Sequence, residues 1–511
     1  MGAQTDRQRA LGDDRGRRSV STQLRSVAPK TYDLLIDGEW LPSRSHETYA
    51  RIDPFDGSIT AHYAQADESD VEAAIRSARR AFDEGPWRRK TAKERAAVLR
   101  RVAEMLVAES EHLQGILMRE LGQPRQAGNV AHAAESLLDV ASIAETWREE
   151  SITLQRSDAV GIIAHEPIGV VGALLAWNRP LSFCHKAGPA LAAGCSVVLK
   201  PAHFTAGAVI ELARMFMEAG LPPGVLNVVT SDTLNGSVAG QAIASSQLVD
   251  MITFTGSTAT GTKVMQAAAS NLKRLTLELG GKSPNVVFAD ASPIEDAVEG
   301  AYQGIAPLTG QACIAGSRLL VQRSIKDEFV AKLIERFKDV QMGDPLDETT
   351  TMGPLVSDTQ LERVTRYVGI GRDEGRLVLG GDRPADARLQ SGSFFEPTIF
   401  DEVDPRATIA QEEIFGPVLA IVGFDTVDEA IRISNSAPYG LASAVWTSNV
   451  NTAMKFARGV RAGTVWINSF RESGIFGMPA GGYGISGLGR EYGPEGYESF
   501  LEKKAIHLPF A

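Results

Sequence analysis

The sequence predicts an α/β protein with open, mainly parallel β-sheets. From residue 170 onward, short apolar runs alternate with helical patterns, which is typical of parallel strands joined by crossover helices. Asn178, Lys200 and Gly256 each follow one of these runs. Because open α/β sheets bind ligands beyond the carboxyl ends of their strands, these residues mark a candidate site.

Composition limits the classes of protein to consider. Hydrophobic residues make up 43% of the 511-residue chain and charged residues 23%, as in soluble globular proteins. The net charge of -11 argues against a nucleic-acid binder. Cys184, Cys195 and Cys313 are far apart, so neither a disulfide framework nor a metal site is indicated. No apolar run reaches the roughly 20 residues that span a bilayer. We therefore expect a cytoplasmic protein without a membrane partner.

The first part of the chain shows a tail, a hairpin and two helices. Residues 1–30 are basic and poor in large apolar groups, and we expect a disordered tail. Residues 32–40 predict a hairpin that turns at Asp37-Gly38. Each of the two helices has residues at capping-box spacing, namely Ser69 with Glu72 and Thr91 with Glu94. Residues 151–168 then predict a polar strand pair.

The alternating region predicts six strands and four helices before Cys313. The strands are 170–177, 196–199, 226–229, 251–254, 275–278 and 285–288, and the helices are 181–193, 205–219, 236–245 and one that starts at Ser292-Pro293. A further buried strand is expected at 318–322. The alternation continues to about residue 475, and a glycine-rich bend at 481–487 precedes a last strand at 503–508.

Cys313 is the candidate nucleophile. It lies among small residues before the strand at 318–322, and small neighbours allow a substrate close to a side chain. Glu278 ends a strand and could take a proton from a thiol or a water molecule. Asn178 could donate its amide to a developing oxyanion. Each residue taken alone also fits a purely structural role.

A glycine-containing turn from Gly256 to Gly261 follows a strand and opens a helix. Free N–H groups at a helix start attract phosphate. The spacing differs from the usual dinucleotide fingerprint, so an ordinary strand–helix turn remains an alternative.

Together these segments resemble the aldehyde dehydrogenase superfamily, in order and spacing, from about Tyr32 to Ile506. The motifs that carry the resemblance are Trp177-Asn178-x-Pro180, Lys200-Pro201, Phe254-Thr255-Gly256-Ser257-Thr258, Glu278-Leu279-Gly280-Gly281-Lys282-Ser283-Pro284, Gly310-Gln311-x-Cys313 and Glu412-Glu413-Ile414-Phe415-Gly416-Pro417.

The resemblance implies oxidation of an aldehyde to a carboxylic acid by NAD or NADP. Cys313 would attack the aldehyde to give a thiohemiacetal and then a thioester, with Glu278 as base and Asn178 as oxyanion donor. The resemblance further implies a set of cofactor-binding residues: Lys200 and Glu413 for the riboses, Gly256, Ser257 and Gly261 for the pyrophosphate, Gly236 and Gly240 for the adenine, Phe415 near the nicotinamide ribose, and Trp177 and Leu279 beside them.

His203 departs from the family pattern. A glutamate commonly stands there and binds the adenosine ribose, and it would repel a 2′-phosphate. Its replacement leaves NADP open, and a protonated His203 could attract the phosphate. We expect NAD to be preferred slightly.

The substrate tunnel is expected to include Arg179, Phe183, Ile314 and Arg471. Arg179 and Arg471 could hold a substrate carboxylate, which would make the enzyme a semialdehyde dehydrogenase. The alternative is that both arginines form surface ion pairs or face solvent. Trp466 and Phe470 could instead line an apolar tunnel mouth.

The implied architecture has three parts. Residues 31–150 and 169–279 would form a cofactor-binding domain, 280–480 a catalytic domain, and 151–168 with 481–511 a small β oligomerisation element. Because the exposed strands need partners, we expect a homodimer or homotetramer. A CoA-acylating enzyme and a catalytically silent homologue are the alternatives, and the presence of Glu278, Asn178 and Cys313 argues against both.

Overall fold

The computed structural model describes residues 28–125, 130–232, 238–471 and 477–510. The first of its two large sheets has the strand order β22-β12-β11-β8-β9-β10-β2-β3. These strands are β2 (Leu34–Ile36), β3 (Glu39–Leu41), β8 (Val170–Leu174), β9 (Ser196–Lys200), β10 (Leu226–Val228), β11 (Met251–Thr255), β12 (Arg274–Glu278) and β22 (Gly487–Leu488). The run from β12 to β10 is parallel, which confirms the predicted fold class.

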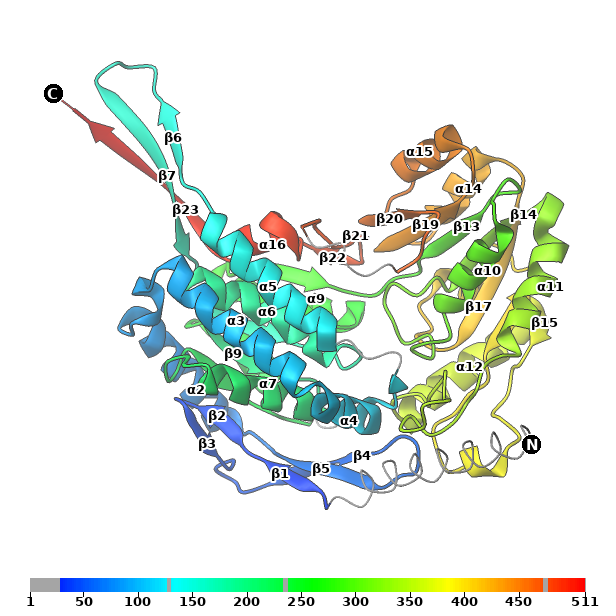
Figure 1. The fold of residues 1–511 in the computed structure, drawn as a ribbon, viewed down its shortest axis with the longest axis horizontal. Coiled ribbons are helices and arrows are strands. Elements are labelled where there is room, and N and C mark those ends of the chain that lie inside the picture. The colour runs from blue at the N-terminus through cyan, green and yellow to red at the C-terminus, as the bar shows by residue number, and fades with distance from the viewer. Residues whose placement is uncertain (1–27, 126–129, 233–237, 472–476, 511) are drawn as a thin grey trace, which may run out of the picture.

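Helices cover both faces of this sheet (Figure 1). Because side chains alternate along a strand, Val197 and Leu199 of β9 face one group of helices and Val198 faces the other. The first group is α3 (Ala92–Ala108), α4 (Ser110–Leu121), α5 (Val130–Thr146), α6 (Phe183–Ala193) and α7 (Ala206–Glu218), and the second is α2 (Glu68–Asp83), α8 (Val238–Ser245) and α9 (Thr258–Ala268).

The second large sheet has the order β15-β16-β17-β14-β13-β19-β20, with only β15 antiparallel to its neighbour. Its strands are β13 (Pro284–Val287), β14 (Arg318–Gln322), β15 (Arg376–Leu379), β16 (Thr398–Asp401), β17 (Val418–Phe424), β19 (Ala442–Trp446) and β20 (Thr464–Ile467). One face packs against α10 (Ile294–Gln303) and α11 (Lys326–Phe337), and the other against α12 (Asp358–Glu374), α13 (Thr408–Gln411), α14 (Val427–Ser434) and α15 (Val450–Gly459).

Three small sheets complete the fold. In Figure 1 the sheet β23-β7-β6 projects from the body as an arm. Its strands are β6 (Glu150–Thr153), β7 (Ala159–Pro167) and β23 (Leu501–Pro509), and α16 (Gly493–Glu498) precedes β23. The other two sheets contain β1 (Lys30–Tyr32), β4 (Thr48–Ile52) and β5 (Ile59–Ala64), and β18 (Tyr439–Gly440) with β21 (Tyr483–Gly484). Short 3-10 segments occur at Trp87–Arg89, Pro180–Ser182, Ala269–Asn271, Arg323–Ile325 and Ala387–Leu389.

The residues that cap the helix N-termini were predicted only in part. The Thr91–Glu94 capping box is confirmed at α3. The predicted Ser69–Glu72 capping box is wrong. The capping box of α2 lies two residues earlier in the chain, where Asp67 is the N-cap and pairs with Asp70. Ser292 does not cap α10, which begins after Pro293 without a side-chain cap. None of the helices in the described ranges is long and apolar enough to cross a bilayer.

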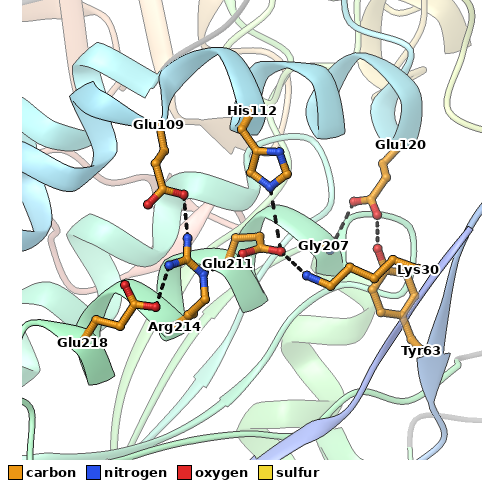
Figure 2. Close-up of polar contacts among 9 residues, drawn as sticks. All are labelled: Lys30, Tyr63, Glu109, His112, Glu120, Gly207, Glu211, Arg214 and Glu218. Carbon is orange, nitrogen blue, oxygen red and sulfur yellow. Dashed lines mark hydrogen bonds and ion pairs between the residues drawn. The ribbon is translucent and has the colours of Figure 1, made fainter. Parts of the chain in front are cut away.

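Two buried carboxylates join the N-terminal strands to the helical layer (Figure 2). The Tyr63 hydroxyl of β5 donates to Glu120 of α4, and the Gly207 N–H of α7 donates to the same carboxylate at 3.2 Å. Glu211 of α7 accepts from Lys30 of β1 at 2.6 Å. Burial raises the pKa of Glu120 to about 8. The predicted tail lies outside the described residues as far as residue 27.

Candidate active site

Four neighbouring strands of the first sheet carry predicted site residues at their carboxyl ends. Glu278 ends β12, Gly256 follows β11, Asn178 lies shortly after β8, and Lys200 ends β9. Because these strands are parallel and adjacent, the four residues lie along one edge of the sheet. Chain order reverses between β8 and β11, and open α/β sheets bind ligands at such a switch point.

Cys313 lies on the loop that leads into β14 of the second sheet. The small residues around it allow close backbone packing. Gly310 has φ +67°, and a Cβ there would lie 1.9 Å from the carbonyl oxygen of Gly416. A Cβ on Gly281, after β12, would lie 2.2 Å from the carbonyl oxygen of Cys313. Gly281 thus allows the Cys313 loop to pack against the segment that follows Glu278, and Gly310 allows the same loop to approach Gly416.

One cavity of about 550 Å³ contains all three candidate catalytic residues. Cys313, Glu278 and Asn178 line it together with the predicted tunnel residues Arg179, Ile314 and Arg471.

Phe183 does not reach this cavity, so that part of the tunnel prediction is wrong. It is fully buried at the start of α6, where its ring packs against Phe216 of α7 with centroids 5.3 Å apart. His185, two residues later, turns toward the cavity instead.

Asn178 joins the two sheets. Its side-chain amide donates to the Gln311 carbonyl oxygen at 3.0 Å. Gln311 in turn accepts from the Val356 N–H at 2.9 Å through its side chain. Since an amide nitrogen carries two hydrogens, Asn178 keeps one for the cavity that it lines.

The Cys313 thiol is protonated at neutral pH in this environment. Burial raises its pKa to about 11, the carboxylates Glu413 and Glu278 add to the rise, and Arg179 opposes it. Because the thiolate is the nucleophilic form, a reaction at Cys313 needs a base.

Glu278 is a buried carboxyl group beside a buried ion pair. Lys186 of α6 pairs with Glu491 and donates to the Thr253 hydroxyl of β11 at 3.2 Å. Burial raises the pKa of Glu278 well above its ordinary value, Glu491 adds to the rise, and Lys186 opposes it. Among the residues that the structure describes, Oε1 of Glu278 has no hydrogen-bond partner. That oxygen is available to a water molecule or a substrate.

The predicted nicotinamide-side residues form one contact network. The Trp177 and Phe415 rings meet edge to face with centroids 5.3 Å apart. Glu413 accepts from the Gly281 N–H at 2.9 Å, which fixes its carboxylate beside the Cys313 loop. Arg363 donates to the Glu413 carbonyl oxygen and so supports the turn at Phe415.

The predicted phosphate turn is a capped helix start. Ser257 caps α9 and accepts from the Thr260 N–H at 3.2 Å. A Cβ on Gly261 would lie 2.4 Å from Leu279, so these two predicted residues pack directly together. Gly240 lies in α8, and Gly236 lies outside the described residues.

His203 and Lys200 lie in a partly buried group of charges. Burial and the Lys200 charge lower the pKa of His203 to about 4, and Asp232 opposes this shift. Burial lowers the pKa of Lys200 to about 8, again opposed by Asp232. His203 is therefore neutral at pH 7, contrary to the idea of a protonated imidazole in the free protein.

Sequence patterns did not identify several lining residues of the cavity. His132 comes from α5, Gln303 from the end of α10, and Tyr492 from the segment before α16. None of them belongs to a local motif, because only the packing of distant segments brings them to the site. The long-range Lys186–Glu491 pair, with a sequence separation of 305, likewise leaves no local signal.

Known proteins of the same kind match nearly the whole chain. Residues 40–506 match the model of the aldehyde dehydrogenase family. The chain is 39% identical to aldehyde dehydrogenase family 2 member C4 of Arabidopsis thaliana, over 97% of this chain and 98% of that protein. It is 39% identical to the betaine aldehyde dehydrogenase of Bacillus subtilis, over 93% of this chain and 96% of that protein.

A solved structure has the same fold. The indole-3-acetaldehyde dehydrogenase AldA of P. syringae, solved as a mutant in complex with NAD⁺ and IAA, superposes with a TM-score of 0.93 at 39% identity. The match covers 97% of this chain and 99% of that one. The family match, the identities and the shared fold agree, and this chain belongs to the aldehyde dehydrogenase family.

Proposed function

We propose that the protein oxidises an aldehyde to a free carboxylic acid in an NAD(P)⁺-dependent reaction through a covalent intermediate on Cys313. The observation that carries this proposal is the single cavity lined by Cys313, Glu278 and Asn178. It combines a thiol, a base and an amide donor, which are the groups that attack on a carbonyl carbon requires.

The edge of the first sheet fits a dinucleotide cofactor. The start of α9 is capped by Ser257 and follows β11 directly, and the N-terminus of a helix attracts phosphate. Lys200 and Glu413 would hold the two riboses, Trp177, Leu279 and Phe415 would enclose the cofactor, and the adenine would lie near Gly240 and Gly236. When bound there, NAD⁺ or NADP⁺ accepts the hydride.

The residues of the chain would perform the remaining steps. Glu278 accepts the thiol proton, and the Cys313 sulfur bonds to the carbonyl carbon to give a thiohemiacetal. The Asn178 amide and the Cys313 N–H stabilise the oxyanion. Loss of hydride leaves a thioester. Glu278 releases the first proton to solvent and then takes a proton from the water molecule that attacks the thioester, so that the Cys313 thiolate leaves and the acid is released.

The charges around His203 support a preference for NAD⁺. The Asp232 carboxylate raises the pKa of both Lys200 and His203, so it lies within charge-interaction range of both. A carboxylate there repels a 2′-phosphate, and a neutral His203 supplies no opposing charge. We propose that Asp232 performs the discrimination for which the family commonly uses the glutamate at the position of His203.

The CoA-acylating alternative is less well supported, because water activation by Glu278 would release the acid without CoA. A silent homologue is disfavoured by the presence of all three catalytic groups in one cavity.

The expected domain division and oligomer remain proposals. The arm supports subunit pairing, because β23 lies at the edge of its sheet and Ile506 and Leu508 expose 41% and 52% of their surface. An edge strand with exposed apolar side chains is suited to pairing with a second copy. We propose a homodimer or homotetramer built on this arm.

An initial-rate screen tests the function directly. Aliphatic, aromatic and carboxylated aldehydes are each offered with NAD⁺ and NADP⁺, with and without CoA, and the product is identified. The proposal predicts free acid without CoA. Strict dependence on CoA, or no turnover with any aldehyde, would overturn it.

A further inference from the structure

Two arginines reach the cavity of Cys313 from opposite sheets. Arg179 follows Asn178 after β8 of the first sheet, and Arg471 lies beyond β20 of the second sheet. Arg471 has φ +57°, in a region that residues other than glycine rarely adopt. The chain therefore holds this side chain at the cavity in an unfavourable backbone conformation.

Neither guanidinium has an acidic partner among the residues that the structure describes. Within the described ranges, no carboxylate lies at ion-pair distance from Arg179 or Arg471. Arg471 donates to the Gln303 carbonyl oxygen at 3.3 Å, which uses one of its five N–H groups. Burial lowers the pKa of Arg471 to about 10, and the positive charge of Arg179 lowers it further. Two like charges that face one cavity without a counter-ion are unfavourable unless a ligand supplies that counter-ion.

The other titratable lining groups do not balance these charges. Burial lowers the pKa of both His132 and His185, so both are neutral at pH 7. Glu491 is already paired with Lys186, so Glu278 is the one remaining carboxyl group against two guanidinium groups in the described lining. The described lining is therefore positive in net charge at neutral pH.

Another part of the lining is apolar. Trp466 and Phe470 pack with ring centroids 5.5 Å apart, and Leu308, Ile314 and Met478 complete this surface. A cavity of about 550 Å³ accepts a small molecule of several carbons. Its occupant should have an apolar body as well as an anionic group.

We propose that the substrate is an aldehyde that carries a carboxylate at its far end, and that Arg179 and Arg471 bind this carboxylate. The inference rests on the proposed function and names the substrate class for the same site. The planar guanidinium matches a carboxylate in two parallel hydrogen bonds. A carboxylate is preferred to a phosphate because apolar side chains share the cavity with the arginines and suit a singly charged, less hydrated group. The same charges disfavour a quaternary ammonium aldehyde.

Matched substrates test the proposal with wild-type enzyme and NAD⁺. One series is 4-carboxybenzaldehyde, its methyl ester and benzaldehyde, and the other is glutaric semialdehyde, its methyl ester and pentanal. Betaine aldehyde and glyceraldehyde 3-phosphate serve as cationic and phosphorylated probes. We expect kcat/KM for the carboxylate to exceed that for its ester by at least about tenfold in one series, mainly through KM. Equal kcat/KM for the carboxylate and its ester in both series, or a preference for betaine aldehyde or the phosphorylated aldehyde, would overturn the proposal.

Variants test the two arginines. R471Q and R179Q should each lower the ratio of carboxylate to ester kcat/KM by about tenfold or more, and R471K should restore part of it because the charge remains. R432Q, at an exposed arginine of α14, is the matched control and should leave the ratio as in wild type. Unfolding temperatures establish that each variant is folded. An unchanged ratio in folded R471Q and R179Q would refute the assignment.

The outcomes distinguish failure of the proposed substrate class from failure of the proposed function. Oxidation of the esters and neutral aldehydes without preference for carboxylates would remove the substrate class and leave the proposed function intact. Absence of oxidation with every aldehyde would remove both.

Discussion

The side-chain amide of Asn178 donates to the backbone carbonyl of Gln311 across 3.0 Å, and this contact ties the edge of the first sheet to the loop that holds Cys313. The candidate oxyanion donor and the candidate nucleophile are thus fixed relative to each other by one short connection. The catalytic geometry depends on how the two sheets are joined.

Asn178→Ala removes both this connection and the amide that faces the cavity. We expect kcat to fall by about 10²- to 10³-fold, as for loss of one oxyanion donor. The loss of one hydrogen bond should destabilise the fold by only about 1 kcal/mol. Steady-state kinetics and thermal unfolding measure the two effects. Asn451→Ala, at an exposed position of α15, is the control. A loss of less than tenfold in kcat would contradict the role of Asn178.

Glu491→Gln tests the electrostatic control of Glu278. Glu491 raises the pKa of Glu278, so its neutralisation should lower that pKa and leave the opposing charge of Lys186 uncompensated. Because the ionised base is the active form, the acidic limb of kcat/KM should shift to lower pH. A shift of about one pH unit corresponds to about 1.4 kcal/mol. Glu495→Gln, exposed on α16, should not shift the profile. A shift to higher pH would contradict this interpretation.

Asp232→Asn tests cofactor discrimination. Removal of a carboxylate from the surroundings of Lys200 and His203 should raise kcat/KM for NADP⁺ relative to NAD⁺ by about tenfold, which equals about 1.4 kcal/mol. Initial rates at saturating aldehyde give the ratio. Asp373→Asn, exposed on α12, is a suitable control. If the ratio stays within twofold of wild type, Asp232 does not discriminate between the cofactors.

Glu120→Gln tests the buried carboxylate of Figure 2. Its pKa in the folded protein is about 8, above the ordinary value of 4.5, so the folded state holds the proton more tightly than the unfolded state. Wild-type stability should therefore decrease as the pH rises from about 4.5 through 8. The variant cannot ionise and should lose most of this slope, whereas Glu104→Gln, exposed on α3, should keep it. Unfolding temperatures between pH 5 and 9 measure the slope, and identical slopes in wild type and E120Q would refute the prediction.

The sequence predicted the fold where local patterns determine structure. The apolar runs at β8, β9, β11 and β14 are largely buried strands, and the run at β12 is a partly buried one. Gly194 ends α6 in a left-handed conformation, as its position after an apolar helix predicts. The resemblance to the aldehyde dehydrogenase superfamily singled out Cys313, Glu278 and Asn178, and all three line one cavity.

The features of the site that the sequence did not predict depend on tertiary packing. Phe183 was assigned to the tunnel because of its place in the chain, yet the rotation of α6 directs its ring to α7 and directs His185 to the cavity. Similarly, nothing local indicates that Lys186 pairs with Glu491. Such relationships arise only when distant strands and helices are assembled.

The central claim is the covalent intermediate on Cys313, and acid quenching tests it most directly. Wild-type enzyme is mixed with NAD⁺ and an accepted aldehyde, quenched in acid during the first turnover, and digested for mass spectrometry. Because the acid stops the reaction before water has released the product, the peptide that contains Cys313 should gain the mass of the acyl group. The same peptide from Cys313→Ala enzyme should gain nothing. Turnover in Cys313→Ala enzyme, or an acyl group on another residue, would contradict the account.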